Sequence, residues 1–316
     1  MTQTIENRAY GVDVSSFNNA NVTEYTNAGA KFVLVKVSEG LDYRNPKAQS
    51  QISTAKANGM LPMAYHYGRF SSNSNVAVQE GNFAVQVAKN VGIPLGSLFA
   101  ADWETDKNNI TSGNKADNTN AILAFMDVVA KAGYKPFLYS GKALLENNID
   151  TKRITDKYGD CLWVAYYKVE GRQDTADFNW FPTMDHVAIW QFADNWKGLD
   201  VDGNIAVKKL TFNTEEPKAT IEPIKTSTQT KTWTDIQGMT WHEEHGTFIT
   251  GGAINLRWGA NTQSTLIATL PAGSEVKYNA WARDNAGRVW LQQPRENGHD
   301  GYLVGRVGTE AWGTFK

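Results

Sequence analysis

The chain has 316 residues, which exceeds the usual size of one domain and predicts two. Its 31 basic and 33 acidic residues give a formal net charge of −2, so charge gives no reason to expect nucleic acid or an anionic membrane as a partner. No apolar run approaches the roughly 20 residues that span a bilayer, and the polar start lacks a signal-peptide pattern, which predicts synthesis in the cytoplasm.

Eight apolar segments in the first two thirds of the chain are predicted to be β-strands. They are short and rich in Val, Ile, Phe, Tyr and Trp, as strands prefer. Several are apolar on both faces, which is typical of strands covered on both sides. In chain order they lie around Val12, at 32–37, around Ala64, at 98–104, and around Phe137, Leu162, Val187 and Val207.

Helices are predicted between the earlier strands, at 21–28, 47–58, 77–91, 115–131 and 141–147. The fourth has the clearest helical spacing of apolar residues. Because strands and helices alternate, the pattern favours a parallel sheet. Eight strands with about five helices predict an irregular (β/α) barrel of the α/β class over residues 1–212.

The composition changes after Phe212. Residues 213–232 contain two prolines, many threonines and little that could be buried, which predicts an extended linker. Residues 233–316 form short strand-like segments separated by Gly and Asn, which predicts a small all-β barrel of five or more strands. The single cysteine, Cys161, lies in an apolar run and is predicted to be a buried structural residue rather than a nucleophile.

The sharpest chemical signal is Asp102-Trp103-Glu104 at the end of an apolar segment. Residues i and i+2 of a strand share a face, so both carboxyl groups would project together from the strand end where barrel active sites are built. At about 6 Å apart they would repel by about 3 kcal/mol, enough to keep one protonated near neutral pH. Such a pair suits glycosidic cleavage; the alternative is a polar strand end with two solvated acids.

Two more acids strengthen the first interpretation. Asp13 ends the first predicted strand, although an Asp in this context also caps turns. Asp202 precedes the last predicted strand, although Asp-Gly is also a common turn. Acids from the first, middle and last strands of a closed barrel would meet on one axis.

Seven motifs in this order resemble glycoside hydrolase family 25, the lysozymes found in many phage endolysins, over roughly residues 8 to 212. The motifs are Gly11-Val12-Asp13-Val14-Ser15-Ser16, Val35-Lys36-Val37-Ser38-Glu39-Gly40, Ala64-Tyr65-His66-Tyr67, Asp102-Trp103-Glu104, Leu162-Trp163-Val164-Ala165-Tyr166, Ile189-Trp190-Gln191-Phe192 and Asp202. The resemblance implies an N-acetylmuramidase that hydrolyses the β-1,4 bond between N-acetylmuramic acid and N-acetylglucosamine in peptidoglycan.

The resemblance also implies roles for the acids. Glu104 matches the general acid and Asp102 the group that stabilises charge in the transition state. Asp13 matches the acid at the base of the site, and Asp202 the late-strand acid, with Asp200 close enough to leave the alignment open by two residues. The pattern leaves open whether an enzyme carboxylate or the substrate's acetamido oxygen is the nucleophile. No cofactor or metal is implied.

Substrate-binding residues are expected among the aromatic side chains on these strands, because flat rings stack on sugar faces. The alternative for each is a packed core position. With Glu39 from the second motif, the candidates are Tyr65, Tyr67, Tyr139, Trp163, Tyr166, Trp190 and Asp200. His66 has no acidic partner nearby in the sequence, so a core or supporting role is expected.

Two acidic clusters are weak metal candidates. His242-Glu243-Glu244-His245 places its histidines three apart, whereas zinc peptidases place them four apart on a helix. Asp156, Asp160, Asp174 and Asp177 lack the twelve-residue calcium loop with its central glycine. Neither pattern predicts a metal site.

Residues 233–316 resemble the bacterial SH3-like domains that accompany wall hydrolases. The resemblance implies binding to the peptide or cross-bridge of peptidoglycan, with Tyr278, Trp281, Trp290 and Tyr302 as candidate contacts. The whole chain is expected to be a monomer that reaches the bacterial wall after release from a host cytoplasm. The alternatives are a catalytically inactive wall-binding protein and a hydrolase of another N-acetylated glycan.

Overall fold

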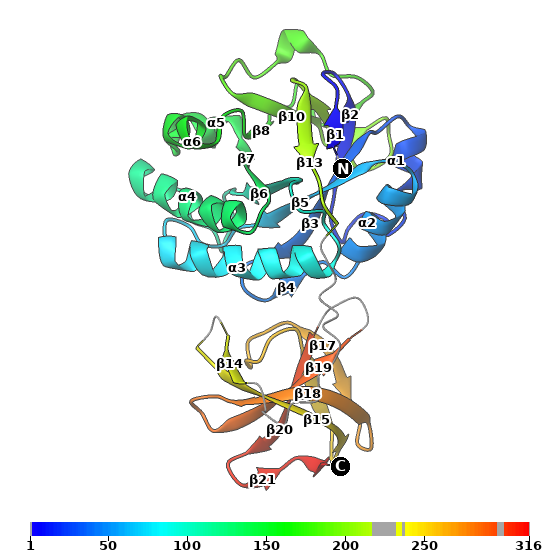
Figure 1. Cartoon of the computed structure of the whole chain (residues 1–316), viewed down its shortest axis with the longest axis vertical. Coiled ribbons are helices and arrows are strands. Elements are labelled where there is room, and N and C mark those ends of the chain that lie inside the picture. Colours follow the sequence, from blue (N-terminus) through cyan, green and yellow to red (C-terminus); the bar gives the residue numbers. More distant parts are fainter. Residues whose placement is uncertain (1, 217–231, 236–237, 296–299, 316) are drawn as a thin grey trace. The chain divides into compact units, whose positions relative to one another are not determined.

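The computed structural model describes residues 2–216, 232–235, 238–295 and 300–315, and the chain divides into two compact units (Figure 1). The first unit comprises the described residues before the stretch 217–231 except 42–44, and the second comprises 42–44 and the described residues after that stretch. Most of the predicted linker, 213–232, therefore lies outside the described residues.

The described part of the first unit contains a closed ring of eight β-strands. The strand order is β2-β12-β10-β8-β7-β6-β5-β3, and pairing of β3 with β2 closes the ring. The barrel predicted from the sequence is thereby confirmed. The strands are β2 (Tyr10–Val14), β3 (Phe32–Glu39), β5 (Leu61–Tyr67), β6 (Leu98–Asp102), β7 (Lys135–Gly141), β8 (Leu162–Ala165), β10 (Val187–Ala193) and β12 (Asp202–Ala206).

The last strand, β12, runs antiparallel to both of its neighbours, β10 and β2, whereas the other pairings in the ring are parallel. The prediction of a parallel sheet is therefore wrong for β12. The connection from β10 to β12 spans only residues 194–201, which is too short for the crossover that parallel strands need. This reversal brings the first residue of β12, Asp202, opposite Asp13 of β2.

Six α-helices occur in the described part of this unit, and α3 and α4 lie together outside the barrel (Figure 1). Five were predicted; the sixth, α6, was not, because Ile154 and Thr155 are its buried residues and leave almost no apolar period. The helices are α1 (Thr23–Asn27), α2 (Ala48–Ala57), α3 (Ser74–Asn90), α4 (Lys115–Lys131), α5 (Lys142–Asn147) and α6 (Thr151–Tyr158).

Short elements complete the first unit. β1 pairs antiparallel with β13, β4 extends the sheet beside β3, and β9 pairs with β11. Their bounds are β1 (Thr2–Ile5), β4 (Tyr43–Arg44), β9 (Arg172–Gln173), β11 (Asn195–Trp196) and β13 (Leu210–Asn213), and a 3₁₀ helix spans η1 (Phe178–Trp180).

Strand β6 shows why the barrel positions chemistry at its edge. Its sequence, LFAAD, is buried along its whole length, because one face packs into the barrel and the other lies under helices. Phe99 on this strand contacts the rings of Phe125 from α4 and Tyr134. The apolar strand ends at Asp102, so the first charged group appears where the barrel opens.

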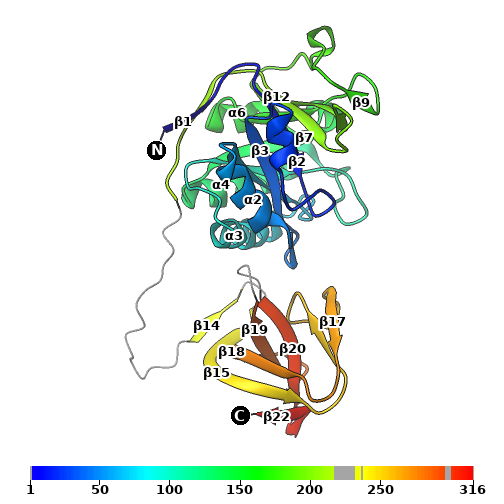
Figure 2. The same ribbon diagram turned by 90° about the vertical axis from the view of Figure 1, so that its right-hand side faces the viewer.

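The second unit is an antiparallel β-sheet whose long strands curl around a core (Figure 2). The last segment pairs with β20 through β21 and with β15 through β22, which joins two sides of the sheet. The all-β character predicted for residues 233–316, with five or more strands, is found in the described part of this unit. The bounds are β14 (Thr232–Thr234), β15 (Thr240–Thr250), β16 (Ile254–Arg257), β17 (Leu266–Leu270), β18 (Glu275–Arg283), β19 (Arg288–Pro294), β20 (Asp300–Val307), β21 (Glu310–Ala311) and β22 (Gly313–Phe315).

Among the described helices of both units, none combines the length and the apolar composition that crossing a bilayer would require.

Candidate active site

Asp102 and Glu104 are held on the same side of the chain by the residue between them. Trp103 is fully buried, and its indole N–H donates a hydrogen bond to the Ser71 carbonyl oxygen at 3.1 Å. The backbone N–H of Trp103 donates to Tyr139 O at 3.0 Å. With Trp103 fixed in the wall, the two flanking carboxyl groups meet and share a hydrogen bond.

Asp13 and Asp202 form a second carboxyl pair at the seam between the first and last barrel strands. They lie directly opposite each other in the β2–β12 pairing, and their side chains share a hydrogen bond. Two ionised carboxylates have only acceptors, so each such pair requires a proton between its members. The open edge of the barrel therefore holds two pairs of adjacent carboxyl groups, each of which is hydrogen-bonded only while one member carries a proton.

In each pair one acid is buried and the other is partly open to solvent. Asp13 is 7% exposed and Asp102 3% exposed, whereas Asp202 and Glu104 are intermediate. The outer member of each pair is thus the one that a ligand can reach, and the inner member acts as its hydrogen-bonding neighbour.

Burial is the main cause of the raised pKa of all four acids. It raises the pKa of Asp102 well above its ordinary value, and the neighbouring Glu104 charge raises it further. Burial also raises the pKa of Glu104, although the hydrogen bond with Asp102 opposes this increase, and the Asp13 charge adds to it. Burial and the Asp13 charge raise the pKa of Asp202 to about 9. Burial raises the pKa of Asp13 as well, although hydrogen bonds from Asn204 and Gln191 oppose this.

Two buried amides, which sequence reasoning missed, hold Asp13 in place. Gln191 Nε2 and Asn204 Nδ2 donate to Asp13 Oδ2 at 2.8 and 2.7 Å. Gln191 Nε2 also lies 3.3 Å from Asp202 Oδ2, so it contacts both members of this pair. Gln191 stands in the quoted Ile-Trp-Gln-Phe motif, but an amide gives no chemical signal that would separate it from its neighbours.

Aromatic hydroxyl and indole groups orient these amides in turn. The hydroxyl groups of Tyr139 and Tyr167 donate to Gln191 Oε1 at 2.8 and 2.5 Å, which leaves the amide nitrogen turned toward the acids. Trp163 Nε1 donates to Asn204 Oδ1 at 2.7 Å with the same result. Tyr167 was not predicted. Tyr139 and Trp163 therefore support the acids, in addition to the sugar contact proposed for them.

Lys36 supplies positive charge beside the acids and lowers the pKa of Asp102 and Glu104 against the effect of burial. Glu39 accepts from Lys36 at 2.5 Å and also pairs with Arg69. The Lys36 ammonium group lies 4.5 Å from the centre of the Tyr67 ring. Glu39 is thus engaged by two cations of the protein and fixes the position of Lys36, which sequence reasoning had not singled out.

The predicted sugar-binding aromatics fall into two places. Tyr67, Asp102, Tyr139 and Trp163 are register partners across β5, β6, β7 and β8, so they form one layer at the barrel mouth. Tyr65 contacts this layer through Trp163, at 5.8 Å between ring centres.

Two predicted aromatics lie away from that layer. Tyr166 is partly exposed and stacks on the Trp180 ring at 6.0 Å. Trp190 is buried between β10 and the rings of Phe178 and Phe181, with its N–H on the Tyr166 carbonyl oxygen. The structure therefore places Trp190 in the packing layer outside the acid cluster.

Asp200 and His66 are two further residues whose positions the structure gives. Asp200 has a φ of 52° and its carbonyl oxygen accepts from Asn18, so it forms a turn before β12; Asp202 is the residue beside Asp13. His66 is fully buried and does have an acidic partner, Glu80 of α3, at 2.9 Å, with Ser38 on its other ring nitrogen at 2.8 Å.

The predicted wall-binding aromatics of the second unit also divide into buried core residues and a partly exposed one. Tyr278 and Trp290 are buried in its two apolar clusters, and Tyr302 packs against Trp241 at 5.5 Å. Trp281 is only partly buried and lines a pocket. The His-Glu-Glu-His stretch lies within β15, and its His242 stacks on the Trp281 ring at 4.4 Å.

A closed barrel that gathers paired carboxyl groups at the edge where its parallel strands end has the architecture of a glycoside hydrolase site. Comparison with known proteins gives the particular family. Residues 12–201 match the glycosyl hydrolases family 25, and the chain belongs to it. The protein is accordingly a glycoside hydrolase of the lysozyme (muramidase) type.

Relatives extend this finding beyond the barrel. A lysozyme of Lactococcus phage mv1 is 38% identical over 174 residues, which cover 55% of this chain and 86% of that protein. A D-alanyl-L-alanine endopeptidase of Streptococcus phage B30 is 31% identical over 308 residues, 93% of this chain and 64% of that protein. The crystal structure of the modular Cpl-1 endolysin complexed with a peptidoglycan analogue superimposes with a TM-score of 0.55 and 25% identity, covering 94% of this chain and 77% of that one.

Proposed function

We propose that this protein hydrolyses the β-1,4 bond between N-acetylmuramic acid and N-acetylglucosamine in bacterial peptidoglycan, with Glu104 as the general acid. The observation that carries this proposal is the contact between the Glu104 carboxyl group and the buried Asp102 carboxyl group beyond the end of β6. Glu104 is the partly exposed member of the pair, so it can reach a glycosidic oxygen. Its raised pKa keeps it protonated at a pH where a solvated glutamate is ionised.

In this proposal the other three acids supply negative charge around the reacting sugar. The Asp102–Glu104 pair carries one proton, which in the reacting complex must lie on Glu104. Asp102 is then the negative charge that stabilises the developing oxocarbenium ion. Asp102 Oδ1 is buried and has no hydrogen-bond partner among the described residues, so it is an acceptor left over for a ligand donor. Asp13 and Asp202 hold further negative charge at the base of the same edge. Retention of configuration is expected, whether the nucleophile is a carboxylate or the substrate's acetamido oxygen.

The relatives support this substrate. The Lactococcus phage protein is a lysozyme, and the Cpl-1 endolysin is complexed with a peptidoglycan analogue. The endopeptidase name of the phage B30 relative does not carry over, since this chain matches less than two thirds of that protein. A thiol peptidase is also disfavoured here, because burial raises the pKa of Cys161 to about 12.

The decisive experiment compares wall clearing by the wild type and by Glu104→Gln. The variant keeps the size and hydrogen bonds of the side chain but has no acid proton, so kcat should fall by about 10²–10⁴-fold. A matched control is Glu6→Gln, which changes an exposed carboxyl group paired with Lys209 at 3.0 Å and should leave the rate unchanged. Equal clearing by the wild type and Glu104→Gln would contradict the proposal that Glu104 is the general acid.

The bond is tested separately by mass spectrometry of digested walls. Cleavage on the proposed side gives fragments with reducing N-acetylmuramic acid ends. Fragments with reducing N-acetylglucosamine ends would contradict the muramidase assignment while leaving Glu104 as the acid.

We also propose that residues 233–316 are an SH3-like wall-binding domain, joined by a linker at 213–232 to the catalytic domain at 1–212. Similarity to the phage B30 protein spans 93% of the chain and so extends through this region. A monomer made in a host cytoplasm would reach the wall after release.

A further inference from the structure

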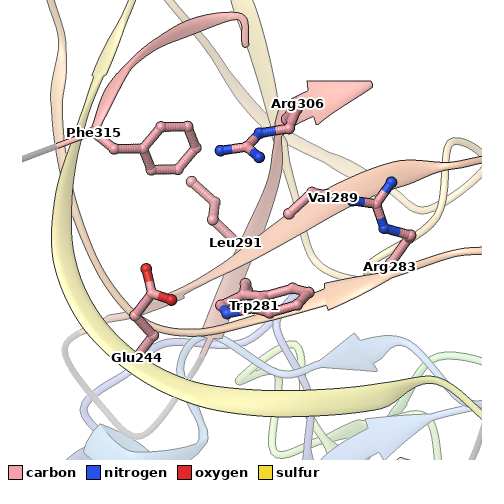
Figure 3. A pocket seen from close by; sticks show the side chains of 7 residues that line it. All are labelled: Glu244, Trp281, Arg283, Val289, Leu291, Arg306 and Phe315. Carbon is pink, nitrogen blue, oxygen red and sulfur yellow. The ribbon is translucent and has the colours of Figure 1, made fainter. Parts of the chain in front are cut away.

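The described part of the second unit contains a pocket of about 250 Å³ on one face of its curled sheet (Figure 3). This volume lies just below the usual range for drug-sized ligands, so the pocket suits a short chain end rather than a glycan strand. Its lining combines apolar side chains with both signs of charge. The lining residues are Glu244, Trp281, Arg283, Val289, Leu291, Arg306 and Phe315.

Strand register places the two arginines on either side of Val289. Arg283 of β18 is the register partner of Val289 on β19, and Val289 is in turn the partner of Arg306 on β20. Adjacent strands lie about 4.8 Å apart, so the two side chains start about 10 Å from each other. Two cations so spaced can hold the two ends of one small anionic group or two acceptors of one peptide.

Among the residues that the structure describes, neither guanidinium group has an ion-pair partner. In the described ranges no carboxylate lies within ion-pair distance of Arg283 or Arg306. Arg306 Nε is buried without a hydrogen-bond partner there, and its guanidinium group lies 5.3 Å from the centre of the Phe315 ring. A buried donor without a partner is unfavourable, and a bound carboxylate would satisfy it.

The remaining polar group is an acceptor. Glu244 stands in a bulge of β15, where the register with β18 shifts between Glu243 and Gly246. Its carboxylate accepts a hydrogen bond from Tyr278 at 2.8 Å. In Figure 3 Glu244 and Arg283 lie at opposite ends of the Trp281 ring, so the negative and positive groups are separated by an apolar floor.

We propose that this pocket binds the peptide stem of peptidoglycan through its free terminal carboxylate. Arg306 and Arg283 receive the carboxylate, the floor of Trp281 and Leu291 receives small apolar side chains, and Glu244 receives a neighbouring ammonium group. The charge pattern favours this occupant over a neutral glycan, because two cations face one anion across the pocket. This inference rests on the wall-binding role proposed for residues 233–316.

The test uses the full chain and calorimetric titration with the tripeptide L-Lys-D-Ala-D-Ala and with its C-terminal amide. The acid should bind about tenfold or more tightly than the amide, because a charge-assisted hydrogen bond is lost with the carboxylate. Arg306→Gln and Arg283→Gln should each weaken binding of the acid by about tenfold. Lys277→Gln removes an exposed charge from the same strand as Arg283 and should bind as the wild type does.

Several results would overturn the proposal. They are equal binding of acid and amide, undiminished binding by Arg306→Gln, and absence of binding by the wild type. Preferential binding of a glycerol phosphate polymer would also overturn it in favour of an anionic wall polymer. Thermal melting of each variant separates loss of binding from loss of folding, and Arg283→Gln serves if Arg306→Gln does not fold.

Failure of the proposed catalytic function would look different. Hydrolysis of peptide-free glycan chains depends on the barrel. Arg306→Gln should therefore retain this activity although its binding of the tripeptide is weakened. A wild type that binds the tripeptide but does not cut peptide-free glycan would support the pocket and reject the muramidase assignment.

Discussion

Burial makes the ionised form of each of the four acids of the site less stable than it would be in water, so all four pKa values are raised. Burial raises the pKa of Asp202 to about 9, so the folded state keeps a proton that the unfolded chain loses near pH 4. Between these two pH values the folded state therefore loses stability as the pH rises. The general-acid role proposed for Glu104 depends on the same effect of burial, since a solvated acid would be ionised at neutral pH.

Asp202→Asn should therefore stabilise the protein. The amide carries no charge to bury and can still donate a hydrogen bond to Asp13. We expect a gain of about 1–2 kcal/mol in the free energy of unfolding at pH 8, which shrinks as the pH falls toward 4, where both states of the wild type are protonated. Thermal melts of both proteins between pH 4 and pH 9 measure this, and a gain that did not vary with pH would contradict it.

The matched control is Asp160→Asn. Lys208 and His186 lower the pKa of Asp160, so this carboxylate contributes stability that is present above its unfolded pKa and lost as the pH falls through its folded pKa. The control should be neutral or slightly destabilising at pH 8, the opposite sign to Asp202→Asn.

At the residue scale the four acids could be predicted because carboxyl groups are conspicuous at the ends of apolar strands. Gln191 and Asn204 could not, since a buried amide resembles any other polar residue until its partners are known. The partner of His66 was missed for a similar reason: Glu80 comes from a helix and is adjacent only in the folded chain.

At the scale of elements, the close approach of β2 and β3 depends on Gly11. Gly11 pairs with Phe32, and a Cβ atom at Gly11 would lie 2.3 Å from the Phe32 ring. Phe32 is fully buried, so the ring cannot move aside without displacing the core. This glycine is a packing requirement two residues before Asp13 of the candidate site.

Gly11→Ala should lower the free energy of unfolding by about 1–3 kcal/mol through overpacking, as measured by urea denaturation. Gly141→Ala is the control, because an added Cβ there meets nothing within 4 Å; its stability should lie within about 0.5 kcal/mol of the wild type. Equal stability of Gly11→Ala and the wild type would show that β2 can shift from β3.

The positions of the strands and five helices followed from apolar patterns, but the direction of β12 did not. Alternating strands and helices favour a parallel sheet, and β12 is the strand that departs from the alternation. The short connection at 194–201 could have indicated the direction of β12, because so few residues can join antiparallel strands but not parallel ones.

For the whole molecule, two units with separate cores predict separable activities. A chain ending at residue 216 should cut soluble peptide-free glycan as fast as the full chain does. On intact walls at low enzyme concentration it should be slower by about 10²-fold, because tethering raises the local concentration of substrate. Turbidity and soluble-substrate assays at equal molar concentration measure both rates, and equal clearing of walls would show that the second unit contributes no tethering.

The antiparallel β12 has one more consequence, which concerns synthesis. Asp202 meets Asp13 only after the last barrel strand has joined the first, and the two residues are separated by 189 positions along the chain. A nascent polypeptide on the ribosome therefore lacks the complete acid cluster until the barrel can close. A translation product that ends before β12 therefore lacks the Asp13–Asp202 pair.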